Sequence, residues 1–221
     1  YMKRTVIING EMLSIDWYKT AFLERHLEKN KGKDLDYKRI LDIGAYDCQE
    51  SLTFTSLFPN ATITAFECNP DNILMCRDNI EKSERIVLVE KMVTDTPDNK
   101  LFYKCHPALG GVSSMHIPAD WSYDKIDVPT IRLDEYLDNS KIDLVWIDVQ
   151  GAELDVLRSF GDKLKNVNTI YCEVDVTCRY DSDSNLDTVS HFLSTNGYLL
   201  KAKMFLSHNE AHIIVEKESV I

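Results

Sequence analysis

Four acidic side chains, each at or near the end of a short apolar stretch, are the strongest candidates for chemistry in this sequence. They are Asp42, Glu67, Asp148 and Glu173. A carboxylate can accept hydrogen bonds from ribose hydroxyls, act as a general base, or bind a hard cation. Each of these roles requires the fold to bring the acidic ends of several stretches together.

The apolar pattern predicts strands that alternate with helices. Strands are expected at 39–44, 61–67, 86–90, 144–149 and 169–174, and helices at 14–29, 50–57, 70–81, 152–164 and 186–194. Such alternation is typical of right-handed βαβ units in a mostly parallel sheet that is covered on both faces. The segments 198–206 and 211–217 predict a final hairpin that adds an antiparallel edge. Ligands of such sheets bind beyond the carboxyl ends of the strands, which is where the acids lie.

The remaining segments are less regular. Between residues 95 and 127 the pattern weakens, and short extra strands are expected only at 101–103 and 128–131. The chain of 221 residues is interpreted as a single domain, 1–221, with an N-terminal helical extension at 1–34 and a core at 35–221. Because the chain begins with Tyr1 and not with Met, it is also compatible with a domain of a larger protein.

The composition excludes several classes of protein. With 36 acidic and 25 basic residues the net charge is −11, which disfavours binding to a nucleic-acid backbone. No apolar run is long enough to cross a membrane or to serve as a signal peptide. The six cysteines form no CxxC pair or zinc-ligand grouping, so they are predicted to be reduced core thiols of a cytoplasmic protein. The oligomeric state is left open.

The first two strands predict a site for a nucleoside. Gly44 ends the first strand and allows close approach of a ligand, and Glu67 follows about 20 residues later, as expected of a group that binds both ribose hydroxyls. The alternative is that Gly44 is only a turn and Glu67 only a solvated strand end. The second and third glycines of a pyrophosphate-binding loop are missing, and Asp47 and Glu50 would repel a pyrophosphate. A cofactor with an ammonium and a sulfonium would tolerate these acids.

These motifs resemble the FkbM family of class I methyltransferases, which use S-adenosylmethionine. The resemblance covers about residues 39–217 and is most specific in two stretches, 128–137 and 142–157, the second of which contains Ile147-Asp148-Val149-Gln150-Gly151-Ala152-Glu153. Three shorter matches are Asp42–Asp47, Glu67–Pro70 and Gly110–Ser114. The family usually has Glu, Lys and Gly where this chain has Gln150, Trp146 and Cys48, which leaves the substrate and the loop details open.

The resemblance implies a doubly wound, Rossmann-like sheet of seven strands and a set of cofactor contacts. Asp42, Gly44 and Ala45 would line the methionine end, with Tyr46, Asp47 and Ser51 close by. Glu67 would hold the ribose, flanked by Cys68 and Asn69. Met92 and Val93 would lie near the adenine, and Ser113 and Ser114 would cover the cofactor.

Methyl transfer to an alcohol benefits from a base that takes the hydroxyl proton. Asp148 is the first candidate for deprotonating or orienting the acceptor, with Glu173 as its partner, because both follow adjacent strands. Two alternatives remain. The pair could hold Mg²⁺ together with the acceptor oxygen, or Asp148 could only cap the helix that starts at Gly151.

The predicted function is methyl transfer to a sugar hydroxyl, for example on a deoxyhexose of a glycan. Arg179, Tyr180 and Trp121 are candidates for substrate contacts, whereas Trp146 lies in an apolar strand and is expected in the core. His106 and His116 flank a candidate lid, and the N-terminal helix could cover the cleft or contact a second copy. The competing hypotheses are a nucleotide-dependent oxidoreductase and a non-catalytic cofactor-binding module.

Overall fold

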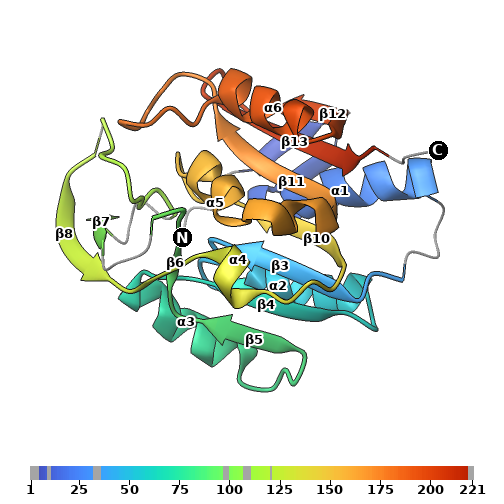
Figure 1. Ribbon diagram of the computed structural model, residues 1–221, viewed down its shortest axis with the longest axis horizontal. Coiled ribbons are helices and arrows are strands. Elements are labelled where there is room, and N and C mark those ends of the chain that lie inside the picture. The colour runs from blue at the N-terminus through green and yellow to red at the C-terminus, as the bar shows by residue number, and fades with distance from the viewer. Residues whose placement is uncertain are drawn as a thin grey trace.

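A computed structural model describes residues 5–8, 11–31, 36–96, 100–106, 111–119 and 121–218. Its centre is a seven-stranded sheet with the order β12-β13-β11-β10-β3-β4-β5 (Figure 1). The strands are β3 (Arg39–Ile43), β4 (Thr62–Phe66), β5 (Ile86–Val89), β10 (Ile142–Ile147), β11 (Val167–Asp175), β12 (Tyr198–Phe205) and β13 (Glu210–Lys217). The first five pair in parallel, and β13 pairs antiparallel with both β11 and β12, which confirms the predicted fold class.

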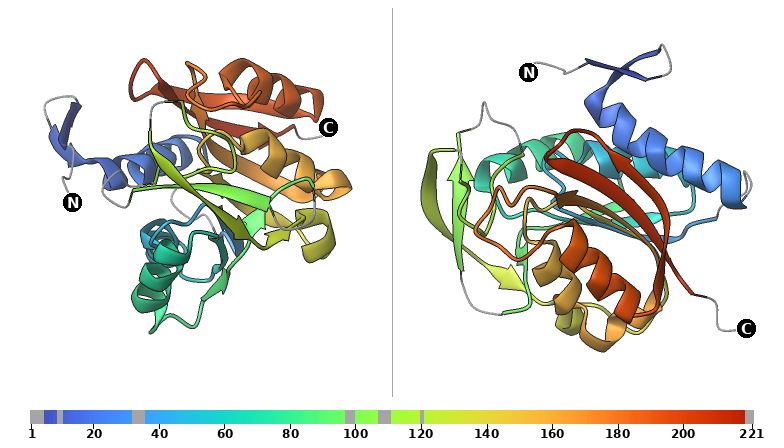
Figure 2. Two further views of the ribbon diagram at one scale, coloured as in Figure 1. Left: turned by 90° about the vertical axis from the view of Figure 1, so that its left-hand side faces the viewer. Right: turned by 90° about the horizontal axis from the view of Figure 1, so that it is seen from above.

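Helices cover both faces of this sheet (Figure 2). Buried residues of α1 (Ile15–Lys31), α2 (Gln49–Leu57) and α3 (Pro70–Ile80) belong to one apolar cluster. The opposite cluster contains residues of α4 (Leu133–Tyr136), α5 (Glu153–Ser159) and α6 (Leu186–Thr195). Continuous apolar strands are needed because both faces are buried, and all six residues of β10 are buried.

Trp146 lies in the core, as predicted. Its ring stacks on that of Tyr171 on the neighbouring strand, with centroids 3.5 Å apart and planes 5° apart. The ring of Phe54 on α2 meets Trp146 edge-on at 5.3 Å. Five of the six cysteines are also buried and unbridged, but Cys178 is exposed, so the prediction of core thiols is wrong for that residue.

Smaller elements differ from the sequence prediction. A hairpin of β1 (Thr5–Ile8) and β2 (Glu11–Ser14) precedes α1, and a second hairpin pairs β7 (Lys100–Cys105) with β8 (Tyr123–Val128). The expected strand at 128–131 is divided at Pro129, which has no N–H to donate. Val128 ends β8, and β9 (Thr130–Ile131) pairs with β6 (Met92–Val93).

The expected helix at 152–164 is also divided. α5 ends at Ser159 and a 3₁₀ helix runs from Gly161 to Asn166, with Gly161 at a φ of 48° between them. Within the described residues, no helix combines the length and the apolar character that a bilayer crossing requires.

Candidate active site

A cavity lies beyond the carboxyl ends of β3, β4 and β10 and measures about 580 Å³ when the adjoining open solvent is counted. Gly44, Tyr46, Glu67 and Asp148 contribute to its wall from the turns that follow these three strands. The parallel arrangement explains this convergence, because the carboxyl ends of parallel strands meet at one edge of the sheet.

Gly44 allows the ends of β3 and β10 to approach closely. Its φ is +87°, and a Cβ placed on it would lie 2.0 Å from the backbone oxygen of Asp148. The backbone N–H groups of Gly44 and Ala45 both donate to Phe66 O at 3.0 Å. The turn after β3 is therefore tied to the end of β4 and leaves no room for a side chain at Gly44.

Glu67 is held by three backbone N–H groups. Its Oε1 accepts from Cys68 at 2.8 Å and from Asn69 at 2.7 Å, and its Oε2 accepts from Tyr46 at 2.9 Å. Burial raises the pKa of this carboxyl, although the three N–H donors oppose the shift. The carboxylate is thus fixed between two turns, accepts a further hydrogen bond from the Asn72 side chain, and lines the cavity.

Seven of the thirteen residues proposed for the cofactor line the cavity: Gly44, Tyr46, Glu67, Cys68, Met92, Val93 and Ser113. The other six are not part of the cavity wall. Ala45 is buried, Asp47 accepts from the backbone of Gln49, Asn69 caps α3, and Ser114 pairs with Tyr103 of β7. The remaining two, Ser51 and Asp42, bond to each other at 2.5 Å.

Asp42 contributes charge to the site from behind the wall. Burial and the nearby Asp148 raise its pKa to about 7, although the hydrogen bond from Ser51 opposes the shift. Burial likewise raises the pKa of Glu50 on α2 to about 8, with Asp42 and Asp148 adding to the shift and Lys19 opposing it. The acids behind the cavity thus repel one another.

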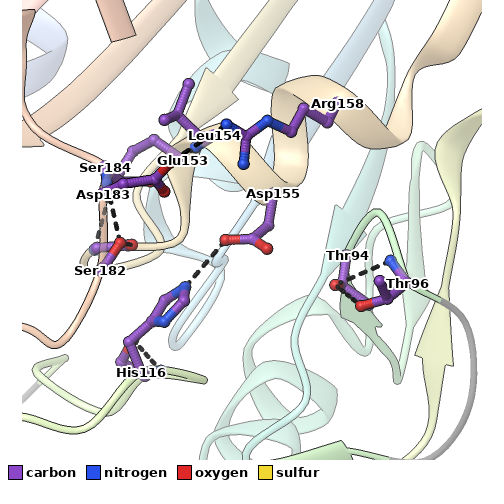
Figure 3. A network of polar contacts seen from close by, with 12 residues as sticks. Thr94, Thr96, His116, Glu153, Leu154, Asp155, Arg158, Ser182, Asp183 and Ser184 are labelled. Carbon is purple, nitrogen blue, oxygen red and sulfur yellow. Dashed lines mark hydrogen bonds and ion pairs between the residues drawn. The ribbon is translucent and has the colours of Figure 1, made fainter. Parts of the chain in front are cut away.

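The segment 111–119 forms another side of the cavity, to which Gly111, Ser113 and Met115 contribute together with Phe102 of β7. Figure 3 shows how His116 fastens this segment to the rest of the fold. His116 Nε2 lies 2.9 Å from Asp155 Oδ2 in the first turn of α5. The predicted lid is therefore tethered to α5 through one of its two histidines; the other, His106, is exposed and is not part of the cavity wall.

The same view shows the loop after β11 attached to the start of α5 (Figure 3). Ser184 Oγ accepts from Leu154 N at 3.0 Å, and Ser182 Oγ donates to Gly151 O. This loop also pairs with the covering segment, because Pro118 and Tyr180 form an antiparallel bridge. Two segments far apart in the chain are thereby held over the same edge of the sheet.

Asp148 and Glu173 are brought together by a lysine that sequence reasoning missed. Lys19 Nζ of α1 lies 2.6 Å from Asp148 Oδ2 and 2.7 Å from Glu173 Oε2. Gln150 Nε2 donates to the other oxygen of each acid, at 2.7 Å to Asp148 Oδ1 and 2.9 Å to Glu173 Oε1. Asp148 is part of the cavity wall, so the pair stands at the edge of the cavity.

The pKa values of the two acids of this pair shift in opposite directions. Burial and the neighbouring Glu173 raise the pKa of Asp148, and Lys19 only partly offsets them. Burial would also raise the pKa of Glu173, but the Lys19 ammonium outweighs it, so that this pKa lies below its usual value. The pKa of Asp148 is therefore shifted upward and that of Glu173 downward by the same set of neighbours.

Capping of a helix does not explain Asp148. The N-cap of α5 is Ala152, without a side-chain hydrogen bond to the helix, so the capping alternative is wrong. The metal alternative meets a different obstacle, because a lysine ammonium already bridges the two acids. One ligand atom from each of Glu173, Glu210 and His212 lies within 4.8 Å of the other two, close enough for the three to share a metal ion. However, both ring nitrogens of His212 already have partners, Tyr171 and Glu210.

The candidate substrate residues form a separate group around Tyr180. The rings of Trp121 and Tyr180 are 6.0 Å apart, and the Arg179 guanidinium lies 5.9 Å from the Tyr180 ring. Arg179 is also paired with Asp175 at 3.3 Å. Tyr180 donates to Gln150 Oε1 at 3.1 Å, which links the group to the acidic pair.

Several residues of the cavity wall gave no signal in the sequence, among them Asn72, Lys91 and Met115. Lys19 offers a partial clue in retrospect, because it precedes Phe22 and Leu23 by three and four positions on the apolar face of α1. A lysine at such a position must find a partner or reach solvent.

Comparison with known proteins agrees with this geometry. The family model described as the Methyltransferase FkbM domain matches residues 42–200. The 2-O-methyltransferase NoeI of Sinorhizobium fredii (strain NBRC 101917 / NGR234) is 31% identical over 153 residues, which cover 61% of this chain and 62% of that protein. The match thus spans less than two thirds of the relative.

Solved structures share the fold at low identity. The fibrillarin pre-rRNA processing protein of Methanococcus jannaschii has a TM-score of 0.57 at 12% identity, over 100% of this chain and 84% of its own. TrmK of M. capricolum, solved with S-adenosyl-homocysteine, has a TM-score of 0.54 at 14% identity, over 94% and 70%. The family match covers most of the chain and includes the ends of all three strands that build the cavity, so the chain belongs to the FkbM methyltransferase family.

Proposed function

We propose that the protein transfers a methyl group from S-adenosylmethionine to a hydroxyl group of a sugar. The observation that carries the proposal is that Glu67, suited to ribose, and Asp148, suited to an acceptor proton, line one cavity. The similarity to a 2-O-methyltransferase supports an oxygen acceptor.

The residues around the cavity suit this cofactor. Glu67 keeps its carboxylate fixed for the ribose hydroxyls, and Gly44 lets the turn after β3 approach the backbone of Asp148 at the edge of the cavity. Burial and neighbouring carboxylates raise the pKa of Asp42, Glu50 and Asp148, and the cofactor's positive charges would relieve that repulsion. When bound, S-adenosylmethionine supplies a methyl group on an excellent leaving group.

The chain's own contribution is position and proton removal. Most of the acceleration in such a displacement comes from holding the acceptor in line with the methyl group. Asp148 would accept the proton of the hydroxyl as the new bond forms, because its raised pKa makes it a stronger base than an exposed aspartate. Trp121 and Tyr180 offer aromatic surface for a sugar ring nearby.

The same acids weigh against a nucleotide-dependent oxidoreductase. α2 begins beside the cavity with Glu50 in its first turn and Cys48 as its N-cap, whereas a pyrophosphate site needs an uncharged, glycine-rich start. Cofactor retention separates the classes: a bound adenosylmethionine-type nucleoside supports the proposal, and bound NAD contradicts it. A non-catalytic module would retain the cofactor without turnover on any acceptor.

Glu67→Gln is expected to weaken S-adenosylmethionine binding by about 1.5–3 kcal/mol, the scale of hydrogen bonds to a charged group. The amide keeps the shape of the side chain but has one acceptor oxygen in place of two, so it cannot serve both the N–H groups and the ribose. Isothermal titration calorimetry measures the change. Glu135→Gln, at an exposed position of α4, is the control, and equal affinity of both variants would remove Glu67 from the ribose site.

The acceptor is tested with an array of free sugars and oligosaccharides incubated with radiolabelled S-adenosylmethionine. We expect label on at least one sugar. RNA and protein acceptors belong in the same array, because the net charge of −11 predicts no transfer to RNA. Label on RNA or protein alone would overturn the sugar assignment and keep methyl transfer. Parallel reactions with EDTA and with added Mg²⁺ decide whether a metal takes part.

A further inference from the structure

Lys19 contacts both acids of the candidate active site although it lies outside the part of the chain that matches the family. It belongs to α1, whereas the family match begins at residue 42. Its ammonium lies 2.6 Å from Asp148 and 2.7 Å from Glu173, and the Lys19 side chain is only 14% exposed. A lysine rarely loses most of its contact with water unless its charge is paired.

The contact is part of a closed ring of four side chains. Lys19 bridges one oxygen of each acid, and Gln150 bridges the other oxygen of each. The orientation of Gln150 is itself set, because its Oε1 accepts from Tyr180 and its backbone has a φ of 55°. Each of the four carboxylate oxygens therefore has a nitrogen within 2.9 Å, although the contact of Lys19 with Glu173 Oε2 is an ion pair without hydrogen-bond geometry.

We propose that Lys19 is a positioning residue of the active site, whose ammonium holds Asp148 and Glu173 as one oriented acidic pair at the cavity. The inference deepens the proposed function and rests on it for the role of Asp148 as a base. The N-terminal helix is then a part of the site and not only a cover for one face of the sheet.

Electrostatics explain why the pair needs a cation. Asp148 and Glu173 contact the same ammonium group, so their carboxylates lie close enough to repel each other. Without a cation between them they would share a proton, and the pKa of one member would rise. The groups that face Lys19 are Asp148 after β10, Glu173 and Tyr171 on β11, Glu50 on α2, and Glu210 on β13. Burial disfavours the charged lysine, but these acids outweigh it and hold the pKa of Lys19 well above its usual value.

The raised pKa of Lys19 decides which residue can act as the base. Because Lys19 keeps its proton, it does not serve as the base, and its charge instead favours the ionised form of its neighbours. Asp148 then remains available to take a proton, while Gln150 and Lys19 fix the direction of its two oxygens. Loss of the Lys19 charge is expected to move the titration of the pair to higher pH.

The test follows the carboxyl carbons by ¹³C NMR in protein labelled at Asp and Glu and saturated with S-adenosylhomocysteine. The Asp148 resonance is identified by its absence in Asp148→Asn. In Lys19→Met its apparent pKa is expected to rise by about 1–3 units, the usual effect of removing an opposite charge. Lys19→Arg should restore the wild-type value, and Lys29→Met, at an exposed position of the same helix, should not change it.

An unchanged Asp148 titration in Lys19→Met would overturn the inference, as would an equal shift in Lys29→Met. Should Lys19→Met fail to fold, Lys19→Gln removes the charge and keeps hydrogen-bond donors. A second measurement uses the acceptor that the array identifies. The acid limb of the kcat/KM profile is expected to move to higher pH in Lys19→Met and to return in Lys19→Arg, with little change in cofactor affinity.

The two measurements distinguish a failure of this inference from a failure of the proposed function. The NMR titration needs no acceptor, so it decides the role of Lys19 even if no sugar is methylated. Methylation of a sugar with an unmoved acid limb in Lys19→Met would overturn the inference and leave the proposed function in place. A uniform loss of activity at every pH would also overturn it, because that is the result of a merely structural contact.

Discussion

Asp148→Asn is expected to lower turnover by about 10²–10⁴-fold, the range for loss of a general base. This corresponds to about 2.7–5.5 kcal/mol of transition-state stabilisation. The substitution is nearly isosteric, and Asn can still accept a hydrogen bond from Lys19, but its amide cannot take a proton. Because Asp148 is one of many cavity residues and Glu67 is unchanged, cofactor affinity should stay within a few fold.

The pH dependence adds a second signature. The base must be ionised, and its pKa is raised, so wild-type kcat/KM is expected to rise with pH through that pKa. In Asp148→Asn this limb should disappear. Asp127→Asn makes the same exchange at an exposed position of β8 and is expected to behave as wild type. Wild-type turnover in Asp148→Asn would show that proton transfer to this residue is not part of the reaction.

Gly44→Ala is expected to cost about 2–5 kcal/mol of folding stability and to abolish cofactor binding in the protein that still folds. Alanine at a φ of +87° is strained, and its Cβ would meet the backbone oxygen of Asp148 at 2.0 Å, so the ends of β3 and β10 must separate. A loss of this size is a large share of the total stability of a domain. Denaturant unfolding and calorimetry with S-adenosylmethionine measure the two effects.

Gly197→Ala separates backbone strain from the clash. Gly197 has a similar φ of +77°, but the nearest atom to an added Cβ is Lys217 Nζ at 3.5 Å. Its cost should therefore be limited to about 1–2 kcal/mol, with cofactor affinity unchanged. If the two variants lose equal stability and bind the cofactor equally well, the close approach of β3 and β10 does not shape the site.

The sequence allowed the sheet and half of the site to be predicted because both depend on local pattern. Alternating strands and helices predict a parallel sheet, and in such a sheet the strand ends meet at one edge. Gly44, Glu67 and Asp148 each stand at such an end, and the structure places all three on one cavity. The residues from 95 to 127 could not be predicted in the same way, because the pairing of β7 with β8 depends on contacts across a long connection.

Side-chain partners within the site were decided only by the tertiary structure. Lys19 precedes Asp148 by 129 residues, and their contact depends on how α1 lies across the sheet and which way it is rotated about its axis. Gln150 reaches both acids from a backbone with positive φ, a conformation that the chain adopts only under tertiary constraint. Periodicity specifies which face of an element is buried, but the pairing of two charges also requires the packing of the elements that carry them. The sequence thus determined which acids reach the carboxyl edge of the sheet, and the packing of α1 decided which cation joins them.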